Sequence, residues 1–157
     1  MSMSSDQVPT GIARENRALR LHPEHLTFAK LPPGSELPDW AKDVRPLSTV
    51  AWSAEETSVL APVRVVPDDI DRFGPWCAFE VEGHIDFLLT GVLNGIITPL
   101  AASHIAVTTL STYNTDWILV PADQADAAVN VWRYHGYTVN VLADSQTSTD
   151  GPTGHTA

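Results

Sequence analysis

One short run, residues 111–116, gathers the side chains best suited to hold a small polar ligand. It places two hydroxyls, a phenol and a carboxylate, on Ser111, Thr112, Tyr113 and Asp116, between two apolar stretches. An ionised aspartate only accepts hydrogen bonds, so Asp116 could bind an ammonium or, through two parallel bonds, a guanidinium. The hydroxyls and the phenol ring add hydrogen bonds and a stacking surface. The same residue types also close tight turns, so the run indicates either a ligand site or turn chemistry.

A second group of candidate residues surrounds the start of a predicted helix near Leu89. Gly83 and Gly91 lack a Cβ atom, so a ligand can approach the backbone closely there. The first turn of a helix offers backbone N–H groups without intrahelical acceptors and a partial positive charge, which suit a carboxylate. A zwitterion would therefore find donors here and an acceptor at Asp116. Gly91 would equally permit close packing of the helix.

The other reactive side chains form no recognisable catalytic or metal-binding pattern. His84, Asp86 and His104 lack a third ligand at a suitable spacing. Cys77 lies with Phe79 on the apolar face of a predicted strand, which is typical of an unreactive core thiol. The motifs of P-loop nucleotide binding, serine hydrolases and zinc metalloproteases do not occur. We therefore predict no catalytic residue, no metal site and no cofactor, and we expect that the protein is not an enzyme.

Charge and composition restrict the partners. Nineteen acidic and nine basic residues give a formal net charge of -10 without any Lys/Arg cluster, so neither nucleic acid nor anionic membrane is expected to bind. A single cysteine excludes an internal disulfide and suits a reducing compartment. The polar start of the chain is unlike a signal peptide, and no apolar run is long enough to span a membrane. These features predict a cytoplasmic location.

The elements that would position the candidate residues alternate in a regular order between residues 76 and 142. Apolar residues that alternate predict strands, and those that recur every three or four positions predict helices. Asp123 is expected to cap the second helix and Gly136 to follow it. The predicted strands are 76–82, 105–113, 116–120 and 137–142, with a turn at 114–115 and helices starting near 89 and 123. This βαββαβ order predicts an α+β, ferredoxin-like fold, in which both helices cover one face of an antiparallel sheet.

The rest of the chain divides into three parts. Residues 1–20 show little periodicity and are expected to form a mobile N-terminus, and residues 143–157 a disordered tail. Residues 21–74 contain three predicted strands, at 26–31, 47–52 and 57–62, and form a small β-rich module. Residues 75–142 form the ferredoxin-like domain, and we interpret the β-rich module as a degenerate copy of it.

Two runs of residues resemble the ACT domain. One consists of Gly83 and residues 89–93, and the other extends from Ser111 to Pro121. More narrowly, they are similar to a branch of small bacterial tandem-ACT proteins related to the cytosolic arginine sensors. Residues 28–33 are similar to the first, degenerate module of that branch. The resemblance implies that modules pair and that a small molecule, usually an amino acid, binds where two modules meet.

The resemblance also implies a ligand site with two sides. The arginine sensors use the turn after a module's first strand and the Ser-Thr-aromatic run. Carried over, the candidate ligand-binding residues are Glu82, Gly83, Thr90 and Gly91 on one side, and Ser111, Thr112, Tyr113 and Asp116 on the other. Animal sensors carry four modules, and this chain has room for two. Whether the pocket forms within one chain or between two chains, and which amino acid fits, therefore stays open.

We thus predict a regulatory ligand sensor that binds a free amino acid through ACT-module pairing, as a homodimer. The alternative is a ligand-free dimerising adaptor that docks on an enzyme or regulator, because open edge strands favour pairing of sheets. A small enzyme that uses Glu80, Glu82, Asp86 and Asp116 as acid–base groups is a third alternative. Nothing in the sequence pairs these carboxylates.

Overall fold

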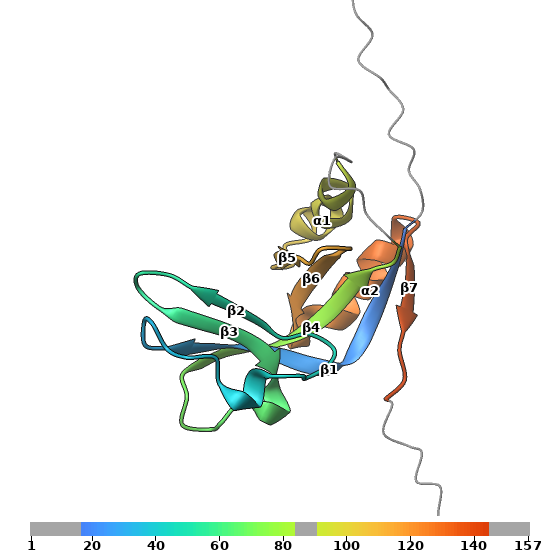
Figure 1. Ribbon diagram of the computed structural model, residues 1–157. Helices are drawn as coiled ribbons and strands as arrows, with labels where there is room; N and C mark the ends of the chain where they lie inside the picture. The colour runs from blue at the N-terminus through green and yellow to red at the C-terminus, as the bar shows by residue number, and fades with distance from the viewer. Residues whose placement is uncertain (1–16, 84–90, 145–157) are drawn as a thin grey trace, which may run out of the picture.

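A computed structural model describes residues 17–83 and 91–144 of the chain (Figure 1). Its elements within these ranges are β1 (Ala18–Leu31), η1 (Asp39–Ala41), β2 (Thr49–Trp52), β3 (Thr57–Pro62), η2 (Val63–Val65), β4 (Arg72–Val81), α1 (Val92–Ala102), β5 (Thr108–Ser111), β6 (Asp116–Pro121), η3 (Ala122–Gln124), α2 (Ala125–Tyr134) and β7 (Thr138–Val141). From β4 onward these elements follow the predicted βαββαβ order. The α+β, ferredoxin-like fold class is confirmed.

All described strands belong to one curled sheet. The strand order is β2-β3-β1-β4-β6-β5, and β7 pairs with β1 beside this path. Every pair is antiparallel except β1 and β7, which run in parallel. We had expected a purely antiparallel sheet, and the parallel pair shows that this expectation was wrong.

The first strand occupies a place that the sequence did not predict. In a ferredoxin-like order the last strand would pair with the first strand of its own module, which is β4. Here the start of β1 lies between them: Leu19 pairs with Val81 of β4 on one side and with Val139 of β7 on the other. Ala18, Leu19 and Arg20, which we expected in the mobile N-terminus, thus belong to the sheet.

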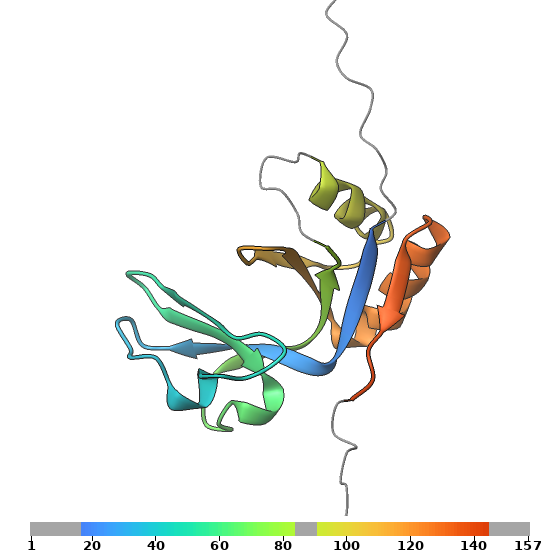
Figure 2. The same cartoon turned by 45° about the vertical axis from the view of Figure 1, so that its right-hand side comes forward.

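The same strand continues into the β-rich half of the chain. Residues 26–31 of β1 pair with β3, and the pairing of β1 with β4 shifts register between Leu21 and His25 and again between Leu26 and Phe28. Such irregularities bend a strand, and Figure 2 shows β1 bending where the two halves of the sheet meet. The two predicted modules therefore share one strand.

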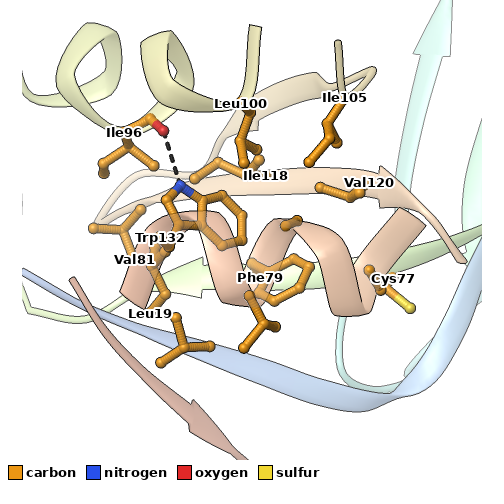
Figure 3. Packing of buried hydrophobic residues seen from close by; sticks show 14 residues of the cluster. Leu19, Cys77, Phe79, Val81, Ile96, Leu100, Ile105, Ile118, Val120 and Trp132 are labelled. Carbon is orange, nitrogen blue, oxygen red and sulfur yellow. Dashed lines mark hydrogen bonds between the residues drawn. The ribbon is translucent and has the colours of Figure 1, made fainter. Parts of the chain in front are cut away.

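Both helices cover the same face of the sheet, as predicted. Figure 3 shows Trp132 of α2 among Ile96 of α1 and the strand residues Val81 and Phe79. The indole Nε1 of Trp132 donates a hydrogen bond of 2.8 Å to the carbonyl oxygen of Ile96, and its ring meets that of Phe79 edge-on at 4.7 Å. The core on this face consists of Leu19, Cys77, Phe79, Val81, Ile96, Leu100, Ile105, Ile118, Val120, Ala125, Ala128, Val129, Trp132 and Val139. We call it the helix face, and the opposite one the helix-free face.

The helix-free face carries its own apolar cluster near the bend of the sheet. Its members come from both halves of the chain and are Leu26, Leu47, Leu60, Trp76, Ala78, Trp117 and Leu119. A third cluster, around Ala29 and Val59, lies beneath η1 and η2. The two halves are thus joined by packing as well as by the shared strand.

Cys77 is a buried core thiol, as expected, and burial raises its pKa above the usual 9.0, helped by the charge of Asp126. The unfolded chain therefore ionises this thiol at a lower pH than the folded protein does. We expect this contribution to stability to be intact below about pH 8 and to be lost as the pH rises past about 9. Urea unfolding of the wild type and of Cys77→Ala, at pH values from below 8 to well above 9, measures it. A constant difference between the two proteins would contradict the expectation.

The ends of the helices differ in how well they were predicted. Asp123 lies in η3, Gln124 precedes α2, and no side chain caps the helix, so the predicted cap was wrong. Because η3 extends to Gln124, the residue directly before α2 is Gln124 and not Asp123. Gly136 follows α2 as predicted, with a φ of 88°. The same geometry ends α1, but there the left-handed residue is His104, with a φ of 59°.

His104→Gly is expected to raise the unfolding free energy by about 1 kcal/mol, because glycine adopts the left-handed region without a Cβ penalty. His104 N–H donates to the carbonyl of Ala101 at 3.1 Å, a bond that glycine retains. Gly136→Ala is the matched control. Nothing lies within 4 Å of an added Cβ there, so only the positive φ is penalised, and about 1 kcal/mol should be lost. Chemical denaturation of both variants measures these changes; a destabilised His104→Gly would contradict this account.

Candidate functional site

Most of the predicted site residues meet at one end of the second module. β4 ends there, and α1 begins there (Figure 1). The chain then returns through α1 to the start of β5. The hairpin between β5 and β6 turns at the same end, where Thr115 Oγ1 donates to the carbonyl of Val81 at 2.6 Å. Glu82, Gly83, Gly91 and the run 111–116 are thereby brought to this end. Thr90 lies outside the described residues.

The hairpin residues hydrogen-bond to one another. Ser111 Oγ donates to Asp116 Oδ1 at 2.5 Å, and these two residues are also partners in the strand ladder. Thr112 binds the carbonyl oxygen of Thr115 through its N–H at 2.9 Å and its hydroxyl at 3.2 Å. The turn is therefore centred on residues 113–114, one position before the predicted turn. Turn chemistry is present, and it holds the Asp116 carboxylate in place.

Tyr113 differs from the prediction in its position. We expected it on a strand, on the same face as Ser111, but β5 ends at Ser111 and Tyr113 lies in the bend. Its side chain is 81% exposed. In one chain, Tyr113 thus offers a ring at the surface of the hairpin and does not line a closed pocket.

The candidate residues lie on both sides of the sheet. Asp116 shares the alternation of Ile118, which faces the helices, and Ser111 pairs with Asp116, so both belong to the helix face. Glu82 shares the alternation of Glu80 and bonds to residues of the helix-free face. The end of the sheet therefore carries one carboxylate on each side.

Glu82 is held by β1, which is next to β4, and by β7, on the far side of β1. Its N–H donates to the carbonyl of Ala18 at 2.8 Å, and its Oε1 accepts a bond of 3.0 Å from Asn140 Nδ2. Arg20 Nε lies 3.9 Å from the same oxygen. Glu82 is thus a positioned carboxylate with a guanidinium beside it.

The sequence did not indicate the cationic residues of this end, Arg17 and Arg20. A Cβ built on Gly83 would lie 4.0 Å from Arg17 Nη1. Arg20 Nη2 donates to Glu80 Oε1 at 3.1 Å, and His22 Nε2 lies 2.8 Å from the other oxygen of Glu80. The available indication was the alternation of Leu19 and Leu21 with Arg20 and His22, which predicts a strand with a polar face.

The start of α1 has the donors that we expected, but it lies at Val92 and not near Leu89, where we had predicted it. Gly91 precedes the helix with a φ of 82°, and no side chain caps it. The first intrahelical bond runs from Gly95 N–H to the carbonyl of Gly91 at 3.0 Å. The N–H groups of Val92, Leu93 and Asn94 therefore have no acceptor within the helix. They suit a carboxylate, as do the two arginines.

Other kinds of site find little support in the described ranges. Residues 17–83 and 91–144 hold no group of three His, Cys, Asp or Glu side chains that could bind a metal ion. An open hollow of about 440 Å³, lined by residues between Leu37 and Val50, lies in the β-rich half and includes none of the candidate residues. No helix of the described chain is long and apolar enough to cross a membrane.

Comparison with known sequences identifies one part of the chain. Residues 74–133 match the sequence model of the ACT domain family. This stretch contains all eight predicted ligand-binding residues. No curated protein matches the chain significantly.

Comparison with known structures supports the same fold over most of the chain. A protein from Agobacterium tumefaciens is similar with a TM-score of 0.75 and 21% identity, covering 81% of this chain and 94% of that one. A Vibrio cholerae protein described as a possible transport protein gives 0.63 and 15%, over 76% and 89% of the two chains. The regulatory subunit of aspartate kinase from Thermus flavus gives 0.50 and 10%, over 75% and 95%. The ACT-type fold is thereby shown; the narrower resemblance to arginine sensors stays a prediction.

Proposed function

We propose that this chain, with an ACT domain match at residues 74–133, is a regulatory protein that binds a free amino acid at the end of its second module. The observation that carries the proposal is the meeting of opposite charges at that end. Asp116 and Glu82 supply carboxylates, while Arg17, Arg20 and the start of α1 supply cations and N–H donors. A free amino acid has both complementary charges. The same proposal makes the protein a non-enzymatic, cytoplasmic sensor.

Each of the predicted residues would have its own role in binding the ligand. A carboxylate of Asp116 or Glu82 would accept hydrogen bonds from the ligand's ammonium group, and Ser111 keeps Asp116 oriented. Gly83 and Gly91 let the ligand approach the backbone. Thr90 and Thr112 would contribute hydroxyls, and Tyr113 a ring.

The exposure of Tyr113 supports a site that a second module completes. A ring that is 81% exposed in one chain would be covered if another copy of the protein packed on the hairpin. A ligand held between two copies would favour the arrangement that it fits, by an amount set by its difference in affinity for the two arrangements. We therefore propose a homodimer whose arrangement reports the ligand.

A thermal-shift screen with each of the twenty amino acids at millimolar concentration tests the function. A ligand at 100 times its Kd should stabilise the protein by about 2.7 kcal/mol, which corresponds to several degrees. One of the variants Asp116→Ala and Glu82→Ala should abolish the shift. Asp123→Ala, which removes an exposed carboxylate in η3 of the same module, should preserve it. If none of the twenty shifts the wild type, the proposed function is wrong.

The edge strand β5 favours a second candidate function, the ligand-free dimerising adaptor. Among the described strands, β5 pairs only with β6, and its residues 108–111 carry no charge. Edge strands of monomeric proteins are commonly protected by charged residues. Sedimentation of the wild type and of Asp116→Ala separates the two candidates. An adaptor would dimerise equally well in both, with and without amino acids.

A further inference from the structure

Thr115 attaches the turn of the β5–β6 hairpin to the end of β4. The ladder between β4 and β6 ends with the pair Glu80 and Trp117, and β6 itself begins at Asp116. Thr115 lies outside that ladder, in the turn, but its Oγ1 donates to the carbonyl oxygen of Val81 at 2.6 Å. A side chain therefore ties the turn to the strand that ends beside it.

The carbonyl that accepts this bond belongs to a fixed part of the sheet. Val81 is 1% exposed, and it pairs with Leu19 of β1. The next residue, Glu82, is held by the bond of 2.8 Å from its N–H to the carbonyl of Ala18. Thr115 is thus bonded to a strand that cannot shift without disturbing the close-packed core.

The turn that Thr115 anchors is closed by hydrogen bonds of its own. The backbone carbonyl of Thr115 accepts from both the N–H and the hydroxyl of Thr112, at 2.9 and 3.2 Å. Ser111 Oγ holds the carboxylate of the neighbouring Asp116. These bonds do not involve Thr115 Oγ1, so removal of that hydroxyl would loosen the turn from β4 without opening the turn itself.

We propose that Thr115 is a positioning residue of the amino-acid site, whose hydroxyl sets the spacing between the two segments that supply the ligand-binding groups. This role rests on the proposed function. Glu82 and Gly83 directly follow Val81 in the chain, and Asp116 directly follows Thr115, so the bond joins the immediate neighbours of both groups. A ligand that contacts both segments binds more tightly when their spacing is already fixed, because less order is lost on binding. Thr115 acts in this way without touching the ligand.

Calorimetric titration of Thr115→Val with each of the twenty amino acids tests this role. Valine keeps the shape of the side chain and removes the hydroxyl. An amino acid that binds the wild type should bind this variant about fivefold to tenfold more weakly. Thr115→Ser, which retains Oγ, should restore the affinity to within about twofold of the wild type.

Thr27→Val is the matched control. Thr27 Oγ1 also donates to a backbone carbonyl of β4, that of Phe73 at 3.1 Å, but at the opposite end of the strand. Its loss should lower the melting temperature much as Thr115→Val does, because both variants lose one hydrogen bond of the same kind. Thr27→Val should nevertheless bind the amino acid as the wild type does.

The outcomes separate this role from the proposed function. If the wild type binds none of the twenty amino acids, both are wrong. If Thr115→Val binds one as tightly as the wild type does, the positioning role alone is wrong. It is equally wrong if Thr27→Val weakens binding as much, or if Thr115→Ser binds as weakly as Thr115→Val. Circular dichroism establishes that each variant is folded.

Hydrogen exchange on the wild type decides the question if Thr115→Val does not fold. An amino acid held between the two linked segments should slow the exchange of the amides of residues 82–83 and of residues 112–116 together. Protection that is confined to one of these segments would overturn the role of Thr115.

Discussion

Trp132→Ala is expected to lower the unfolding free energy by about 3–5 kcal/mol, the largest loss that we anticipate for a single substitution. Trp132 is fully buried and is the largest side chain of the core. It joins the two helices through its hydrogen bond of 2.8 Å to Ile96 and packs edge-on against Phe79. Its loss would leave a cavity between α1, α2 and the sheet. Urea denaturation followed by circular dichroism measures the change.

Trp52→Ala is the matched control for this prediction. The Trp52 indole also donates to a backbone carbonyl, that of Ser35 at 2.7 Å, but its side chain is 57% exposed. Without a deep cavity the loss should be about 1 kcal/mol. Trp132→Phe should fall between the two alanine variants, because it keeps a ring and loses the bond to Ile96. Equal losses for the two alanine variants would show that burial does not decide the effect.

Leu19→Ala is expected to lower the unfolding free energy by about 2–5 kcal/mol. Leu19 is fully buried, pairs with Val81 and Val139, and belongs to the core beneath the helices. The substitution therefore removes apolar contacts from three strands at once. Denaturant unfolding measures the loss.

Leu37→Ala provides the comparison on a similar side chain. Leu37 is 39% exposed and lies in the β-rich half, outside the three apolar cores. Its truncation should cost less than about 1 kcal/mol. If Leu19→Ala costs no more than that, the start of β1 is not a structural part of the second module.

The second module could be predicted because its signals are local. Residues 77, 79 and 81 alternate as a half-buried strand does, and Ala128, Val129 and Trp132 form one stripe of a helix that ends at Gly136. A period of two or of about 3.6 residues follows directly from the geometry of strands and helices. The order of elements then restricts the fold to a few topologies.

The insertion of β1 could not be predicted from such patterns. The strand next to β4 is chosen by long-range pairing, and nothing in residues 18–21 indicates that β7 will lie on their far side. Their polar members, Arg20 among them, seemed to belong to a mobile segment. The ion pairs around Glu80 were missed for the same reason, since that residue was expected on a solvated strand face.

The candidate site was predicted in part. Topology brings Glu82, Gly83, Gly91 and the hairpin residues to one end of the module, because a helix that follows a strand begins where that strand ends. Periodicity does not say how two separate segments are placed across the sheet, so the separation of Asp116 from Glu82 by the sheet was not foreseen. The ligand-binding roles of these residues remain predictions.

The parallel pairing of β1 with β7 has a consequence for biosynthesis. β1 completes its hydrogen bonding only with β7, which begins at Thr138, so it must wait until that strand has left the ribosome. Contacts between residues this distant in sequence form slowly, because a long loop must close before they are made. During that interval β1 has an unpaired edge, and the nascent chain is at its most exposed to association with other chains.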